Sequence, residues 1–162
     1  MSGNNIRRET TLEVTEGPYY KEGSPRRNNV VKEGTNGEKL IVEGHVFDNK
    51  GNSINGCWLD FWQADGKGVY DNVGYNLRGH QLTDNNGAFR LETVVPAMYG
   101  TRTPHIHVKL RANSRTPVVT SQLFFPDQAR NKTDPIFNPK LVMKVVDAQE
   151  HKQASFDFVL DA

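Results

Sequence analysis

The feature that most constrains the fold is a series of seven short apolar runs separated by turn-forming residues, with no long stretch of helical periodicity. The runs are rich in Val, Phe and Leu, while Gly, Asn, Asp and Pro stand between them. Short strands at this spacing are typical of an antiparallel sandwich or barrel. The sequence therefore predicts an all-β fold, with a single antiparallel β-sandwich domain and long irregular loops over residues 1–162. The predicted strands span residues 39–48, 57–64, 88–95, 105–111, 118–125, 141–146 and 155–160.

The segments outside these runs are polar. Residues 1–38 are rich in Gly, Pro and Asn, which predicts an extended, irregular N-terminal arm. One helical turn is predicted over Pro126 to Lys132. The first ten residues lack the apolar stretch of a signal peptide, so we expect a cytoplasmic protein by default, with a secreted mature form as the alternative.

Charge and composition exclude several kinds of partner. The chain has 20 Lys and Arg against 19 Asp and Glu, so it carries no basic footprint for nucleic acid and no polybasic patch for a membrane. Its longest apolar runs are too short to span a bilayer. Cys57 is the only cysteine, which rules out an intrachain disulfide, and its apolar surroundings favour a core position. The oligomeric state stays open between a monomer and a homo-oligomer.

Two histidines in the run His105-Ile106-His107 are the strongest sign of chemistry. Side chains two residues apart on a strand share a face, so both imidazoles would point the same way. Two imidazoles on one rigid strand form half of a metal site. The pattern does not choose the metal, because zinc, copper, nickel and iron all accept imidazole. His45, His80 and His151 have no partner at ligand spacing and are interpreted as structural or surface residues.

Two loop tyrosines, Tyr70 and Tyr99, narrow the choice of metal. A phenol keeps its proton until about pH 10. The field of a trivalent iron reverses that preference and favours the phenolate. A pair of phenolates would cancel two of the three positive charges and hold the ion as Fe(III).

Other polar residues lie near these candidates. Arg102 precedes His105 by three residues, where a fixed cation can stabilise developing negative charge, although a solvated guanidinium is the ordinary alternative. Gln122 would face the same cavity if its strand pairs with the histidine strand. Pro18 and Tyr19 belong to a Gly-Pro-Tyr-Tyr turn that can wall an aromatic pocket.

Taken in order, these motifs resemble the catalytic domain of the intradiol ring-cleavage dioxygenases, the family of protocatechuate 3,4-dioxygenase and catechol 1,2-dioxygenase. The resemblance runs from about Thr15 to about Phe125 and continues more weakly to the end of the chain. The motifs that carry it are Gly17-Pro18-Tyr19, Trp62-Gln63-Ala64-Asp65 with Gly68-Val69-Tyr70, Leu77 to Asp84 with Gly87, Pro96-Ala97-Met98-Tyr99, Arg102 to His107, and Thr120 to Phe125.

The resemblance implies a mononuclear non-haem Fe(III) held by two tyrosines and two histidines on a β-sandwich. It also implies a catecholic substrate that is cleaved with O2 between its two hydroxyl-bearing carbons, giving a cis,cis-muconate-type diacid. The implied ligands are Tyr70, Tyr99, His105 and His107, with Tyr99 leaving the iron when substrate binds. Arg102 and Gln122 match the positions beside the ligands that assist catalysis, and Pro18 and Tyr19 match the segment that lines the substrate pocket.

The chain departs from the family pattern in three places, of which the change of the usual Thr-Thr-Gln to Thr120-Ser121-Gln122 is minor. The usual Pro-Gly-x-Tyr-Pro is here Pro96 to Gly100, which changes the stiffness of the loop that holds Tyr99. The chain is also too short for the helical N-terminal domain through which catechol 1,2-dioxygenases dimerise. We therefore expect a closer likeness to single-domain members of the family. The ring substituent stays open, and Arg78 and Arg26 are candidates for binding a substrate carboxylate.

Two alternatives compete with this interpretation. One is a metal-free transport or carbohydrate-recognition sandwich in which Trp58, Trp62 and nearby tyrosines bind sugars or aromatic compounds. The other is a zinc or copper enzyme that uses only His105 and His107. That second alternative leaves the placement of Tyr70 and Tyr99 without a reason.

Overall fold

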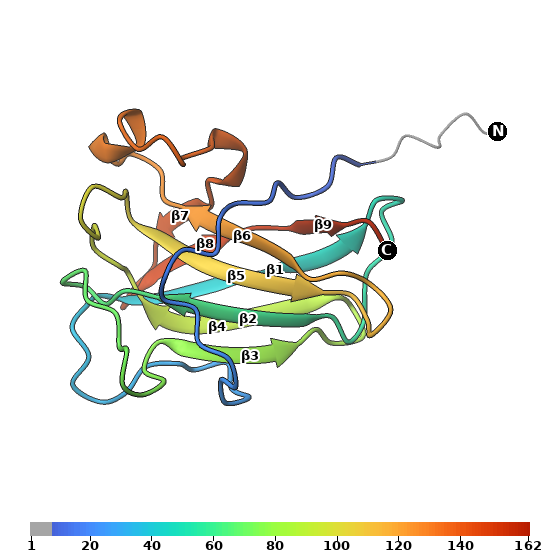
Figure 1. Ribbon diagram of the computed structural model, residues 1–162, viewed down its shortest axis with the longest axis horizontal. Helices are drawn as coiled ribbons and strands as arrows, with labels where there is room; N and C mark the ends of the chain where they lie inside the picture. Colours follow the sequence, from blue (N-terminus) through green and yellow to red (C-terminus); the bar gives the residue numbers. More distant parts are fainter. Residues whose placement is uncertain (1–7) are drawn as a thin grey trace.

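The protein is a sandwich of two β-sheets packed face to face (Figure 1). A computed structural model describes residues 8–162; residues 1–7, on which the signal-peptide prediction partly rests, lie outside the described part. One sheet has the strand order β4-β1-β8-β7, with β9 also paired to β1, and the other has the order β3-β2-β5-β6. The predicted all-β sandwich is confirmed. The strands are β1 (Lys39–Asp48), β2 (Trp58–Gln63), β3 (Arg78–Leu82), β4 (Ala88–Val94), β5 (His105–Arg111), β6 (Val119–Phe124), β7 (Lys144–Asp147), β8 (Lys152–Ser155) and β9 (Phe158–Leu160).

Alternation along the strands builds the core between the sheets. On β5, Ile106, Val108 and Leu110 are fully buried in the main hydrophobic cluster. Their neighbours His105 and His107 therefore point to the opposite face of that sheet. Cys57 is also part of the core, where burial raises the pKa of its thiol to about 12, so its interpretation as a core residue is confirmed.

Two strands were not predicted. The segment that forms β3 contains Arg, Gly, His and Gln, which have little preference for strands, and it is held by pairing with β2. The predicted strand over 155–160 is wrong in its bounds: β8 ends at Ser155, and only Phe158–Leu160 of the predicted run forms a strand, because the chain leaves the sheet at Phe156 and Asp157. Both strands, β8 and β9, pair parallel to β1, so the sandwich is mainly but not wholly antiparallel.

The break between β8 and β9 explains a glycine in the middle of β1. A Cβ added at Gly44 would lie 1.7 Å from the carbonyl oxygen of Phe156, so only glycine allows the two backbones to approach this closely. The predicted helical turn is present as a 3₁₀ helix, η1 (Ala129–Lys132), and a second one, η2 (Pro139–Leu141), precedes β7.

The N-terminal arm crosses the outer face of the β3-β2-β5-β6 sheet, as the dark blue trace in Figure 1 shows. It is fixed to each side of that sheet by hydrogen bonds. Val14 N donates to Thr120 O on β6, and Arg27 N donates to His80 O on β3. An irregular arm is what the sequence predicts, but the structure shows in addition that this arm covers the face that carries both histidines.

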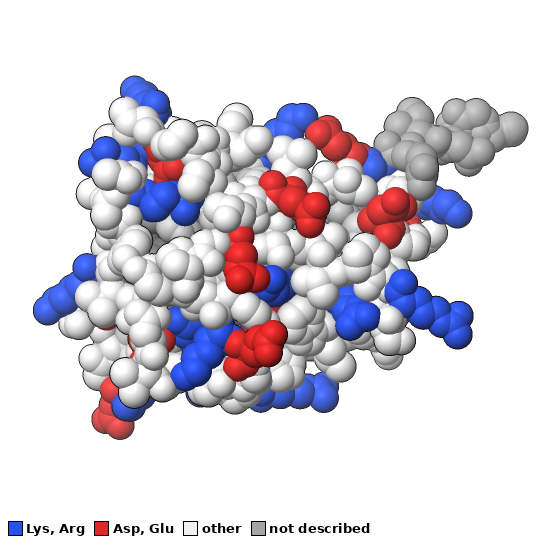
Figure 2. All heavy atoms as spheres, in the orientation of Figure 1, with Lys and Arg blue, Asp and Glu red and all other residues white. Residues whose placement is uncertain are grey.

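Basic and acidic side chains are interspersed over the face shown in Figure 2. Within residues 8–162, no helix is long and apolar enough to cross a membrane.

Candidate metal centre

The two histidines lie side by side in the middle of the covered sheet. In the register of β5, His107 stands opposite Trp62 on β2 and Gln122 on β6. His105 and His107 are 4% and 3% exposed. Strand alternation and central placement in the sheet thus give a buried imidazole pair on a rigid support.

Tyr70 completes a triangle of donor atoms with this pair. Its Oη lies 2.9 Å from His107 Nε2 and 3.3 Å from His105 Nε2, and the two Nε2 atoms are 3.0 Å apart. Ligand bonds of about 2.1 Å that meet near a right angle place neighbouring donor atoms about 3 Å apart. The three atoms therefore lie at the spacing that ligands of one metal ion require.

Tyr99 reaches the same cluster from a different loop. Its ring packs edge-on against Tyr70 with centroids 5.4 Å apart, and its hydroxyl contacts the hydroxyl of Tyr19. Tyr19 in turn stacks on Tyr70 with centroids 4.7 Å apart. The structure therefore brings together Tyr70, Tyr99, both histidines and Tyr19, while Pro18 is an exposed residue of the arm beside them.

The histidines are held in the form that binds metals. Burial lowers the pKa of His105 to about 4 and the pKa of His107 well below its ordinary value, so both rings are neutral near neutral pH. His105 Nδ1–H donates to Thr103 O at 2.7 Å, which leaves the lone pair of Nε2 directed at the cluster. His107 Nδ1 has no hydrogen-bond partner among the described residues.

The donor set discriminates between metals. Burial raises the pKa of Tyr70, so its phenol stays protonated unless a strong cation lies beside it. In the part of the chain that the structure describes, no three His, Cys, Asp or Glu side chains gather into a metal site. A metal here must use phenol oxygen, a hard ligand that suits trivalent iron better than zinc or copper. The residues present therefore fit a ferric ion.

Arg102 stands beside the cluster and is held in place by two side chains. Its Nε donates to Asp134 Oδ2 at 2.9 Å, and its Nη2 donates to Gln122 Oε1 at 2.6 Å. The positive charge of Arg102 contributes to lowering the pKa of both His105 and His107, so it acts within reach of the candidate metal centre. Asp134 was not among the sequence candidates, since an aspartate that precedes proline after a helical turn is typical of an ordinary turn.

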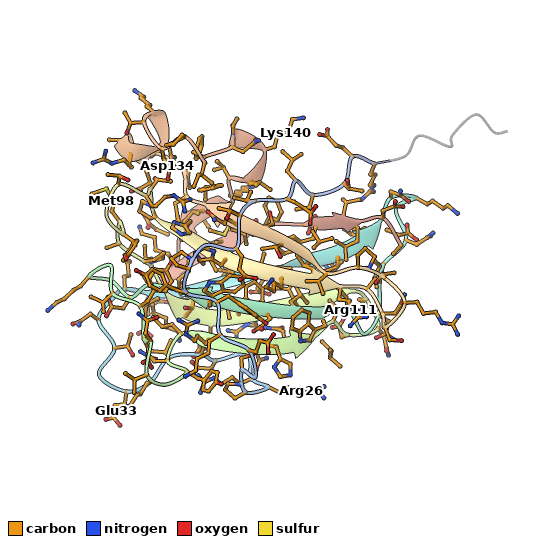
Figure 3. All side chains as sticks on the ribbon, in the orientation of Figure 1. Arg26, Glu33, Met98, Arg111, Asp134 and Lys140 are labelled. Atoms are coloured by element: carbon orange, nitrogen blue, oxygen red, sulfur yellow. The ribbon has the colours of Figure 1, made fainter. Side chains whose placement is uncertain are left out.

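Neither Arg78 nor Arg26 is placed to bind a substrate carboxylate at this site. Arg78 is buried, and its guanidinium donates to the carbonyl oxygens of Tyr19 and Asp71. Arg26 is exposed on the arm, where it forms a β-bridge with His80, and Figure 3 places it away from the end that carries Met98 and Asp134. Arg78 thus anchors the arm and the Tyr70 loop to each other.

Trp62 does not form part of an open sugar-binding platform. Trp62 is 1% exposed, and its ring stacks on His107 with centroids 4.7 Å apart and planes 9° apart. Trp62 also makes an edge contact with Tyr20, whose hydroxyl donates to Asp60 Oδ2 at 2.9 Å. Trp62 therefore supports the ring of His107 from behind, which contradicts the carbohydrate-recognition alternative for this residue.

The loops that carry the two tyrosines are locked together at Gly68. This residue has φ of +81°, and an added Cβ would lie 2.2 Å from Met98 O. Gly68→Ala is expected to lower the free energy of unfolding by about 1–3 kcal/mol and to reduce metal content, because it strains the Tyr70 loop and displaces the Tyr99 loop. Thermal unfolding and metal analysis of the purified variant test this.

A matched control lies in the neighbouring loop. Gly100 also has a positive φ, +56°, but no atom lies within 4 Å of its added Cβ. Gly100→Ala should therefore strain the backbone without displacing a neighbouring loop, and the variant should keep its metal. Equal metal loss in the two variants would contradict the proposed contact between the loops.

Comparisons with known proteins show that the chain is similar to several dioxygenases. A family model described as dioxygenase matches residues 15–162. The dioxygenase domain of a dioxygenase carbohydrate-binding protein fusion from Streptomyces sp. SirexAA-E superposes with a TM-score of 0.91 at 46% identity, covering 94% of this chain and 99% of that one.

Two curated relatives are more distant. A chlorocatechol 1,2-dioxygenase from Pseudomonas putida is 27% identical over 149 residues, which cover 76% of this chain and 57% of the relative. A hydroxyquinol 1,2-dioxygenase from Nocardioides simplex is 34% identical over 119 residues, which cover 67% of this chain and 40% of the relative. The chain thus spans less than two thirds of the length of these curated relatives.

Proposed function

Because this chain belongs to the intradiol ring-cleavage dioxygenase family, we propose that it binds one non-haem Fe(III) and cleaves a catechol with O2 between the two hydroxyl-bearing carbons. The product would be a cis,cis-muconate-type diacid, in which both oxygen atoms of O2 are retained. The observation that carries this proposal is the triangle of Tyr70 Oη, His105 Nε2 and His107 Nε2 at 2.9–3.3 Å.

The ligands would be Tyr70, Tyr99, His105 and His107. When bound, the ferric ion would hold the catechol as a chelate, favour loss of its hydroxyl protons through Lewis acidity, and draw electron density from the ring so that the ring can react with O2. Tyr99 lies in a half-buried loop and is therefore the ligand best placed to be displaced. Its Oη would then accept one of the two catechol protons, and the hydroxide that the catechol replaces would accept the other, so no separate general base is required.

The residues around the ligands would orient the substrate and exclude water. Arg102 places a fixed positive charge where negative charge develops on the bound ring. Gln122 is fully buried, donates to Thr15 O at 3.0 Å, and so ties the arm to the sheet beneath the site. Tyr19, which contacts both tyrosine ligands, forms the aromatic wall of the pocket.

Iron loading and oxygen consumption test the proposal directly. Protein loaded anaerobically with iron and then reoxidised should be red-brown from charge transfer between tyrosinate and iron. It should take up one O2 per catechol and release a diacid that mass spectrometry identifies. A protein that stays colourless, or one that yields an aldehyde from cleavage beside the two hydroxyls, would refute the assignment.

The guanidinium of Arg78 is already hydrogen-bonded to backbone carbonyls, which leads to a prediction about substituents on the catechol ring. We expect kcat/KM for protocatechuate to be at least about tenfold lower than for 4-methylcatechol, because Arg78 is already engaged by two backbone carbonyls and Arg102 is assigned to the charge that develops on the ring, so a substrate carboxylate would be desolvated without a cation of its own. The 4-methyl compound is the control because it carries a substituent at the same ring position without charge. Equal or higher kcat/KM for protocatechuate in oxygen-uptake assays would show that another cation serves the carboxylate.

A further inference from the structure

The guanidinium of Arg102 is held on two edges and left open on the third. Its Nε donates to Asp134 and its Nη2 donates to Gln122. Nη1 makes no hydrogen bond to any residue between 8 and 162. Two fixed contacts of this kind set the plane of the guanidinium, so the direction of the remaining nitrogen is determined as well.

Asp134 is itself fixed by several contacts. Its side chain is fully buried; Oδ2 also accepts a hydrogen bond from Thr103 N at 2.8 Å, and Oδ1 accepts one from Ile136 N at 2.9 Å. Burial alone would raise the pKa of this carboxyl, but the hydrogen bonds from Arg102 and from the two backbone N–H groups lower it. A charged carboxylate is thus built into the turn that follows η1.

The turn that carries Asp134 is also tied to the metal-site strand. Thr103 Oγ1 donates to Asn131 Oδ1 at 2.6 Å, and Asn131 Nδ2 donates to Phe125 O at 2.8 Å. Thr103 O accepts the Nδ1–H of His105. Figure 3 shows Asp134 at the same end of the sandwich as the Tyr99 loop, where Met98 is labelled.

We propose that Asp134 is a positioning residue, which holds the guanidinium of Arg102 so that its open edge faces the substrate at the metal centre. This proposal rests on the proposed function, since it concerns the same site. Asp134 would not touch the substrate; it would act through Arg102 alone. Without the carboxylate, Arg102 would keep its charge but lose one of the two contacts that fix its direction.

A double-mutant cycle separates positioning from a merely structural role. Asp134→Asn should lower kcat/KM for catechol by about 10- to 100-fold, mostly through kcat, with iron content and resting colour unchanged. In an Arg102→Ala background the same substitution should change kcat/KM by less than about twofold, because the group it positions is gone. Asp127→Asn is the matched control, since Asp127 is an exposed aspartate just before η1 whose φ of +60° asparagine tolerates.

A measurement on the metal-free protein gives a readout that does not depend on catalysis. The Nε–H of Arg102 should exchange slowly with solvent in wild type and in Asp127→Asn when followed by NMR, and quickly in Asp134→Asn. The proposal is overturned if the falls in kcat/KM caused by Asp134→Asn and by Arg102→Ala multiply in the double variant. It is also overturned if Asp134→Asn has wild-type kcat/KM, or if the Asp134→Asn protein loses its iron. Iron-loaded wild type that cleaves no catechol would refute the proposed function itself, whichever way the NMR result falls.

Discussion

Replacing His107 by alanine is expected to abolish iron binding, and with it the colour and the activity. The imidazole is almost fully buried, and its Nε2 lies within 3.0 Å of both His105 Nε2 and Tyr70 Oη. Removing it opens a gap at the centre of the donor set that no other described His, Cys, Asp or Glu is placed to fill. Metal analysis and visible absorbance should show less than about a tenth of the wild-type iron.

The control for this variant is His151→Ala. His151 hydrogen-bonds Gln153 at 3.1 Å in the sheet remote from the metal centre, so its loss should leave iron content unchanged. Circular dichroism should show that both variants keep the β-sandwich. A folded His107→Ala protein with full iron and colour would contradict the ligand set.

The strands were predictable where apolar residues recur within a short run bounded by turn-forming residues. The bounds predicted for β1 and β5 agree with the structure, because β1 contains the apolar run Leu40 to Val42 and β5 alternates apolar with polar residues. The strand β3 could not be found in this way, since its residues Arg78 to Leu82 become strand only by pairing with β2 and with the arm. Predicting it would require knowledge of the tertiary partners.

The candidate site, like the strands, could be predicted from the sequence only in part. The His-x-His spacing predicts two imidazoles on one face, and the structure places them there. The convergence of Tyr70 and Tyr99 depends on loops whose path is set by contacts such as Gly68 with Met98, so spacing alone did not place them. Asp134 was missed because it lies thirty-two residues after Arg102, and only the folding of the turn after η1 onto β5 joins the two.

The role of the arm could not be predicted from its composition. Gly, Pro and Asn indicate irregular structure, and this holds for the described part of residues 1–38. Composition does not show what such a segment covers. Hydrogen bonds from Val14 to β6, from Tyr20 to β2 and from Arg27 to β3 lay it across the histidine face, where it closes the site from one side.

Tyr99→Phe is expected to keep iron but lose most of its turnover. The other three ligands, Tyr70, His105 and His107, form the buried triangle, and the phenyl ring can keep its edge contact with Tyr70. What the variant lacks is the hydroxyl that would leave the metal and take a catechol proton. Proton transfer of this kind contributes about 10²- to 10⁴-fold, so kcat should fall within that range, as oxygen uptake at saturating catechol would show.

The absorbance spectrum distinguishes this explanation from a general disturbance of the site. With one phenolate removed, the charge-transfer band should weaken and shift but remain, since Tyr70 still binds the ion. Tyr75→Phe is the matched control, because the hydroxyl of Tyr75 donates to Glu22 O at the surface and its loss should change neither colour nor kcat. If Tyr99→Phe turns over at the wild-type rate, the proton acceptor lies elsewhere; if it loses all its iron, Tyr99 is an anchor of the ion and cannot be the ligand that substrate displaces.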